Sequence, residues 1–129
     1  MKFEAIDHLV LTVKNIEATC KFYGDVLGME IVTFGNGRLA FKFGTQKLNV
    51  HQLDDLSTPK AIQPTPGSVD FCLIAQDSLV EAIEYLQANG VEIIEGPVRR
   101  TGAMGKIISI YIRDPDRNLI EISNYEDKK

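Results

Sequence analysis

Ala5-Ile6-Asp7-His8-Leu9-Val10-Leu11-Thr12-Val13 is the stretch of sequence that decides the fold. Aliphatic and β-branched residues dominate it, which is typical of a strand whose alternate side chains point to opposite faces. His8 then shares one face with Ile6, Val10 and Thr12. An imidazole in an otherwise apolar strand makes His8 the first candidate for chemistry.

The residues that follow predict one helix and three strands. Asn15 can cap a helix over residues 16–27, and Gly28 supplies the left-handed conformation that ends it. Three strands separated by glycine-containing turns are then expected over residues 29–34, 39–43 and 47–53. Residues 5–53 are therefore predicted to form one βαβββ unit.

The second half repeats this order over residues 68–125. Its helix is capped by Ser78 and ends at Gly90. Its strands are expected over residues 68–75, 91–95, 107–113 and 118–124. His8 and Gly28 each have a counterpart 62 residues later, at Asp70 and Gly90, so the chain reads as two copies of one unit.

The last strands follow a different spacing. Aligning His51 with Glu121 gives an offset of 70, so about eight extra residues fall in the second copy. The glycine-bounded loop 96–105 is the natural place for them, and such a loop suits a lid. Residues 54–67, which contain three prolines, read as an extended crossover between the copies.

A single α+β domain over residues 1–129 is the expected architecture. Neither unit can bury a sheet face alone, so we expect the two βαβββ repeats to form one curved mixed sheet with helices on its outer face. The 129 residues, 44% of them hydrophobic, suffice for one core and are too few for two ordinary domains. The concave inner face of the sheet would then be the pocket.

Composition excludes several classes of function. Fourteen basic and eighteen acidic side chains give a net charge of −4, and no basic cluster suits nucleic acid. The N-terminus resembles neither a signal peptide nor a membrane span, so a cytoplasmic protein without membrane contact is expected. Cys20 and Cys72 lack the CxxC spacing of zinc or redox sites, and are interpreted as reduced, buried packing residues.

Four side chains that can bind a metal fall on the first and last strands of the two copies. They are His8, His51, Asp70 and Glu121. Each interrupts an apolar strand, and a buried ionisable group without a partner is costly, so convergence on one divalent ion is expected. Imidazoles with carboxylates suit Zn, Ni, Mn, Fe or Co and leave positions open for substrate.

Simpler interpretations stand beside this one. A lone strand histidine is more often an ordinary core or surface residue, and only the repeat raises His51 above that expectation. Asp70 could instead form a hydrogen bond to a metal ligand and orient it without touching the metal itself. Asp114-Pro115-Asp116 reads as a turn. Arg99 and Arg100 are more often solvated loop charges than groups that hold an anionic substrate.

The chain resembles the vicinal oxygen chelate superfamily, which includes glyoxalase I, fosfomycin-resistance proteins, extradiol dioxygenases and bleomycin-resistance proteins. The resemblance covers nearly the whole chain, and within the superfamily it looks closest to the glyoxalase-domain-containing protein group. The segments that carry it are residues 7–13, 21–29 and 113–121.

The resemblance implies metal ligands at His8, His51, Asp70 and Glu121. Asp70 stands where fosfomycin and dioxygenase members usually have His, and His51 stands where glyoxalase I has Glu. Arg117 replaces the usual Gly of the Asp-Pro-Asp-Gly-Asn turn, a change that touches the turn rather than the metal.

The resemblance also implies a function. Glyoxalase I-type isomerisation of a ketoaldehyde thiohemiacetal is the first expectation, with a small, possibly thiol-conjugated substrate and Glu121 as the base. A thiol transferase or dioxygenase using the same metal, or a protein that sequesters an antibiotic without chemistry, remain alternatives. A homodimer is expected by analogy.

Overall fold

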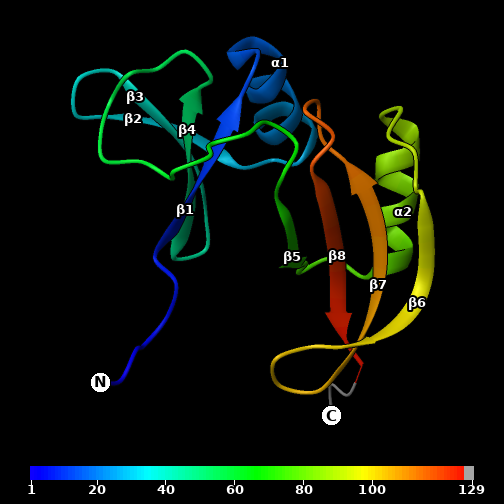
Figure 1. Cartoon of the computed structure of the whole chain (residues 1–129). Coiled ribbons are helices and arrows are strands. Elements are labelled where there is room, and N and C mark those ends of the chain that lie inside the picture. The colour runs from blue at the N-terminus through cyan, green and yellow to red at the C-terminus, as the bar shows by residue number, and fades with distance from the viewer. Residues whose placement is uncertain (127–129) are drawn as a thin grey trace. The chain divides into compact units, whose positions relative to one another are not determined.

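The computed structural model of the chain describes residues 1–126, which divide after Ser68 into two compact units (Figure 1). The first contains β1 (His8–Val13), α1 (Ile16–Cys20), the π-helical segment η1 (Lys21–Val26), β2 (Glu30–Phe34), β3 (Arg38–Phe43) and β4 (Gln46–Gln52). The second contains β5 (Asp70–Ile74), α2 (Leu79–Ala88), β6 (Glu95–Thr101), β7 (Lys106–Arg113) and β8 (Leu119–Tyr125). The predicted α+β fold of two βαβββ units is confirmed.

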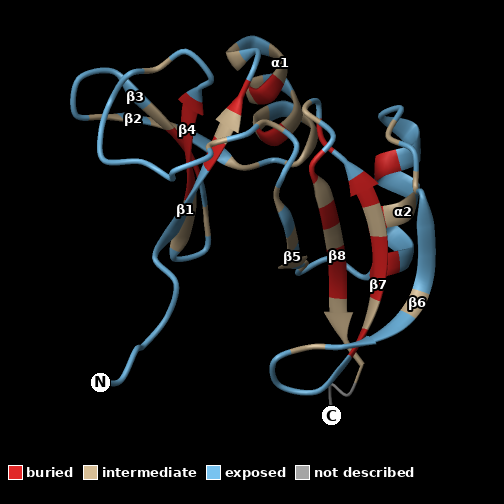
Figure 2. Cartoon of the chain, in the orientation of Figure 1, coloured by how far each residue is buried: buried red, intermediate tan, exposed pale blue. Residues whose placement is uncertain are grey.

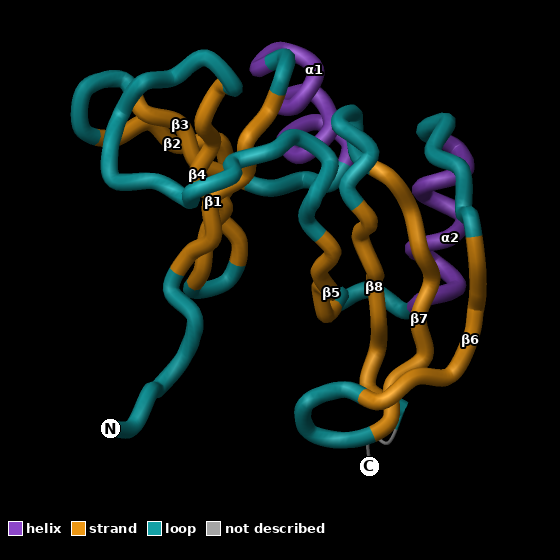
Figure 3. Tube along the Cα trace, viewed as in Figure 1, coloured by secondary structure: helices purple, strands orange, loops and turns teal. Residues whose placement is uncertain are grey.

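The two sheets have the same topology. Their strand orders are β1-β4-β3-β2 and β5-β8-β7-β6 (Figure 3). In each sheet the first and fourth strands of the unit pair in parallel, and the remaining neighbours pair antiparallel. The first strand of each unit therefore lies directly beside the last, so the register of the two strands decides which predicted site residues are neighbours.

The core of the first unit lies between its sheet and its helical segment. Leu11 and Phe41 are fully buried on the helix side of the sheet, and the Phe41 ring stacks on Tyr23 of η1 at 5.2 Å between centroids. Asn15 caps α1, its Oδ1 accepting a hydrogen bond from the Ala18 amide. Figure 2 shows buried residues toward the C-terminal end of β1 and along β4. We call the opposite side of each sheet, turned away from its helix, the open face.

The predicted single helix over residues 16–27 is only partly correct. The chain leaves α-helical geometry at Lys21 and continues as η1, in which the Leu27 amide donates to the Phe22 carbonyl five residues back. A π-helix retains apolar residues on one side, so spacing alone could not distinguish it from an α-helix. Gly24 lies against Ile31 of β2, where a Cβ atom would come within 2.6 Å of the Ile31 side chain.

The second unit packs α2 against β7 and β8. Leu79, Ala82 and Leu86 of the helix are buried, as are Ile110 and Ile120 of the sheet. Ser78 caps the helix as predicted, accepting a hydrogen bond from the Glu81 amide. No helix within residues 1–126 is long and apolar enough to cross a membrane.

The turn before β8 confirms the interpretation of Asp114-Pro115-Asp116. The Asp114 carboxylate accepts hydrogen bonds from the Asp116 and Asn118 amides and from the Asn118 side chain. Arg117 takes a φ of 73°, a left-handed conformation that an L-residue adopts at some cost. The buried Asp114 and Asn118 side chains therefore hold the turn in the shape that a glycine would adopt freely.

The prediction of a strand over residues 91–95 and a lid over 96–105 is wrong. β6 instead runs from Glu95 to Thr101 and pairs with β7, so only residues 102–105 form a turn. Gly96 makes this possible, because its φ is 105° and a Cβ atom there would overlap the Ser109 carbonyl. The glycine thus marks a bulged strand rather than the start of a loop.

Candidate metal centre

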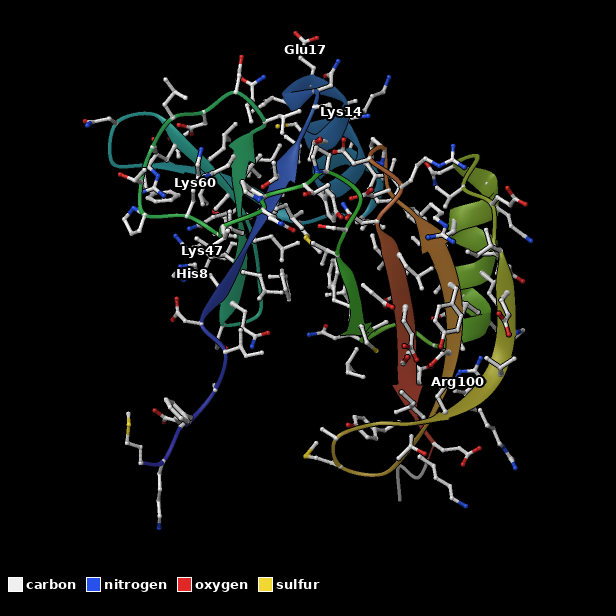
Figure 4. The ribbon with its side chains drawn as sticks, in the orientation of Figure 1. His8, Lys14, Glu17, Lys47, Lys60 and Arg100 are labelled. Carbon is white, nitrogen blue, oxygen red and sulfur yellow. The ribbon has the colours of Figure 1, made fainter. Side chains whose placement is uncertain are left out.

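His8 begins β1 on the open face of the first unit. Its strand partner is Lys47 of β4, and Figure 4 labels both side chains. The His8 Nδ1 lies 2.9 Å from the carboxylate of Asp7. A carboxylate at one ring nitrogen fixes the tautomer and directs the other nitrogen outward, as metal-binding histidines commonly require. His8 is therefore prepared to offer its Nε2 to an ion.

His51 lies on the same open face but at a distance from His8. Its strand partner is Thr12, four positions along β1, which separates the two histidines by about 13 Å at about 3.3 Å per residue. The buried His51 ring faces Arg38, with Nε2 at 3.4 Å from a guanidinium nitrogen. Zinc binds histidine nitrogens at about 2.0–2.1 Å. The structure therefore does not bring His8 and His51 together.

The strand registers correct the predicted repeat. His8 pairs with Lys47, and its counterpart Asp70 pairs with Leu119, so the last strands are offset by 72. The position equivalent to Glu121 is therefore Asn49, and the predicted equivalence of His51 and Glu121 is wrong. A shift of two residues keeps a side chain on the same face, so alternation along the strand could not reveal the error.

Asn49 is the residue of this face that the sequence analysis missed. It is 5% exposed, and its Oδ1 has no hydrogen-bond partner among residues 1–126. An unsatisfied buried acceptor costs about 1–3 kcal/mol, which a structural asparagine would normally avoid by pairing. In the sequence, only its position two residues before His51 in an apolar strand could have suggested that Asn49 belongs to the site.

The open face of the second unit carries Asp70 and Glu121. Asp70 is exposed at the start of β5, and Glu121 is half-buried in the middle of β8. Ser109 of β7 donates a hydrogen bond to the Glu121 Oε2 at 2.5 Å and lies 2.6 Å from the Ser123 hydroxyl. Both serines are fully buried, so they hold the carboxylate in a fixed orientation.

Tyr111 and Arg100 extend this polar face. Tyr111 is the strand partner of Glu121, and its hydroxyl accepts a hydrogen bond of 3.0 Å from the Arg100 Nε. Burial and the nearby Glu121 carboxylate raise the pKa of Tyr111, while Arg100 opposes them. Arg100 therefore lies on a strand beside candidate site residues. Arg99 instead forms a salt bridge of 2.6 Å with the Glu126 carboxylate.

The cysteines differ in part from the prediction. Both are free, as expected, but Cys20 is half-buried and Cys72 is exposed. Cys72 lies on the open face because it alternates with Phe71 and Leu73 along β5, and its Sγ is 3.2 Å from the Ser123 hydroxyl. It contributes to the polar face rather than to packing against the helix.

The chemistry of the donors fits a divalent metal, although no unit completes a site by itself. Within residues 1–126, neither unit gathers three His, Cys, Asp or Glu side chains close enough to hold an ion. The first unit offers an oriented imidazole at His8, and the second offers carboxylates at Asp70 and Glu121.

Comparison with known proteins identifies the family. The profile of the Glyoxalase/Bleomycin resistance protein/Dioxygenase superfamily matches residues 5–122. The chain belongs to this superfamily. The match spans both βαβββ units and confirms the resemblance drawn from the sequence.

Two relatives are about half identical to this superfamily member over the aligned residues. RDO1, a glyoxalase domain-containing protein of Mycosarcoma maydis, is 50% identical over the whole chain, which covers 73% of the relative. Virulence protein STM3117 of Salmonella typhimurium is 53% identical over 97% of the chain and 87% of the relative. The crystal structure of STM3117 superimposes with a TM-score of 0.95, covering 97% of this chain and 99% of that one.

More distant members carry names that state an activity. Metallothiol transferase FosB of Shouchella clausii is 29% identical over 91% of this chain and 77% of the relative. A lactoylglutathione lyase from Agrobacterium tumefaciens is 26% identical, with a TM-score of 0.74 and 95% of each chain covered.

Proposed function

We propose that the protein is a divalent-metal-dependent enzyme that acts on a small substrate with neighbouring oxygens. Glyoxalase I-type isomerisation of the thiohemiacetal formed from a ketoaldehyde and a thiol is the favoured reaction. The observation that carries the proposal is the Asp7–His8 contact, which orients an imidazole on the open face in a chain of this superfamily. The names of the two distant members, a metallothiol transferase and a lactoylglutathione lyase, support a thiol-containing substrate.

His8, Asp70 and Glu121 are the proposed ligands, and the metal would supply Lewis-acid stabilisation of negative charge on the substrate oxygens. His51 is left out of this set because of its separation from His8 in the sheet register. The remaining position falls to water. A homodimer is the proposed assembly, by likeness to other members.

Glu121 is the proposed base. Its carboxylate would take the proton from the carbon that bears the hydroxyl and the sulfur and return it to the carbonyl carbon, while the hydroxyl proton passes to the former carbonyl oxygen, so the substrate is isomerised without net loss of a proton. The Ser109 hydroxyl donates to Oε2 and restrains the carboxylate, which would leave the metal as it takes the proton. Tyr111, with its raised pKa, stays protonated at neutral pH beside it.

The test is turnover of methylglyoxal with glutathione by metal-free protein reconstituted separately with Ni, Zn, Mn and Co. We expect S-lactoylglutathione to form above the uncatalysed rate with at least one of these metals, and chelation to abolish it. If none of these metals gives a rate above background, the proposal of glyoxalase I activity is rejected. If the protein also binds no metal and His8→Ala leaves its ligand binding unchanged, a sequestering protein becomes the better account.

A further inference from the structure

Two cations on the open face of the first unit gather around one aromatic ring. The Lys47 ammonium lies 3.7 Å from the centroid of the Phe34 ring, and the Arg38 guanidinium carbon lies 5.1 Å from the same centroid. These residues come from β4, β2 and β3, so three neighbouring strands direct them to one place. Lys47 is half-buried, which restricts its side chain further.

The two charges are not neutralised by the protein. Among residues 1–126, neither Arg38 nor Lys47 forms a salt bridge with a carboxylate. An aromatic ring attracts a cation through its quadrupole and orients it without cancelling its charge. This arrangement stands out in a chain whose net charge is −4, because Coulomb attraction to the excess carboxylates would otherwise favour pairing.

Polar groups continue the same face toward His8. Lys47, Asn49 and His51 alternate along β4 and therefore point to one side of the sheet. Asn49 contributes a buried Oδ1 without a protein partner, and His51 contributes a ring that already faces Arg38. Lys47 is also the strand partner of His8. Lys47 thus neighbours the residue proposed above as a metal ligand, and Arg38 lies beside His51.

From this juxtaposition we infer that Arg38 and Lys47 form a subsite for an oxyanion, a carboxylate or phosphate group carried by the small substrate. The inference rests on the proposed function for the identity of the bound molecule as a substrate. The two cations supply charge-assisted hydrogen bonds to the oxyanion. Asn49, two residues from Lys47 on the same face of β4, accepts a hydrogen bond from a hydroxyl of the substrate.

The test uses metal-free, full-length protein, so that it does not depend on turnover or on the metal. Acetate and inorganic phosphate are titrated separately at constant ionic strength while 1H–15N spectra of the backbone and of the Asn49 side chain are recorded. We expect saturable shifts at Lys47 and Asn49 with at least one anion. Lys47→Gln and Arg38→Gln should each weaken binding about fivefold or more, while Lys21→Gln, the same charge change on η1, should not.

Absence of saturable shifts with both anions would overturn the subsite. Equal weakening by Lys21→Gln would also overturn it, because it would show a general response to net charge. Spectral dispersion confirms that each variant is folded, and the Arg38 and Lys47 variants test the same subsite from different strands. Anion binding that persists in a protein without glyoxalase activity would uphold this inference while rejecting the proposed reaction.

Discussion

Replacing Glu121 with Gln is expected to lower turnover of the thiohemiacetal by roughly 10²–10⁴-fold, the usual contribution of a general base. Glutamine has the same shape and can still accept the Ser109 hydrogen bond seen at Oε2, but it cannot take a proton. Initial rates with the metal that best supports turnover measure the effect, and metal content is measured on the same samples.

Glu84→Gln provides the matched control. Glu84 is exposed on α2, so this substitution makes the same chemical change at a position away from the open face. Its turnover should equal that of the unaltered protein. A Glu121→Gln variant that retains metal and more than half of the activity would show that the base lies elsewhere.

Phe41→Ala should produce the largest loss of stability, about 3–5 kcal/mol in the free energy of unfolding. Phe41 is fully buried, and its ring stacks on Tyr23, so truncation leaves a cavity and removes a contact between the first sheet and η1. Urea denaturation of metal-free protein, followed by circular dichroism, measures the change.

Phe3→Ala is the control for Phe41→Ala. Phe3 is 85% exposed, so removing its ring should change the free energy of unfolding by less than about 0.5 kcal/mol. Equal effects of the two substitutions would mean that the packing of Phe41 against the helical segment does not stabilise the unit.

The architecture of each unit was predictable because it depends on local signals. The Asn15 and Ser78 caps, and the alternation along β1, identify helices and strands without knowledge of tertiary contacts. The π-helical turn at Lys21 and the displacement of β6 to Glu95 were not predictable in this way. Both depend on close packing at a glycine, Gly24 against Ile31 and Gly96 against Ser109.

The sequence identified the polar residues of the open faces, but it did not identify which positions of the two units correspond in the strand register. His8 and Glu121 lie on the open faces, in contact with Asp7 and Ser109, and their role as metal ligands stays a prediction. His51 and Asn49 are two residues apart on one face, so the sequence pattern favoured the better metal ligand of the two. Only the pairing of β1 with β4 shows that Asn49, not His51, corresponds to Glu121.

The serines that hold Glu121 carried no usable signal either. Ser109 and Ser123 lie in apolar strands, where a serine does not by itself indicate a functional role. Their role follows from the antiparallel pairing of β7 with β8, which makes them strand partners and places Ser109 within reach of the carboxylate. Such a contact depends on strand pairing, which a single sequence does not specify.

Nitrogen NMR of the imidazole rings during titration with Zn²⁺ tests the central claim most directly. The chain contains two histidines, so the spectrum has only two ring systems to assign. One equivalent of Zn²⁺ should shift the Nε2 resonance of His8 and leave the ring of His51 in place, and Asp70→Asn or Glu121→Gln should weaken the effect. A His8 ring that does not respond, or a shift confined to His51, would contradict the proposed ligand set.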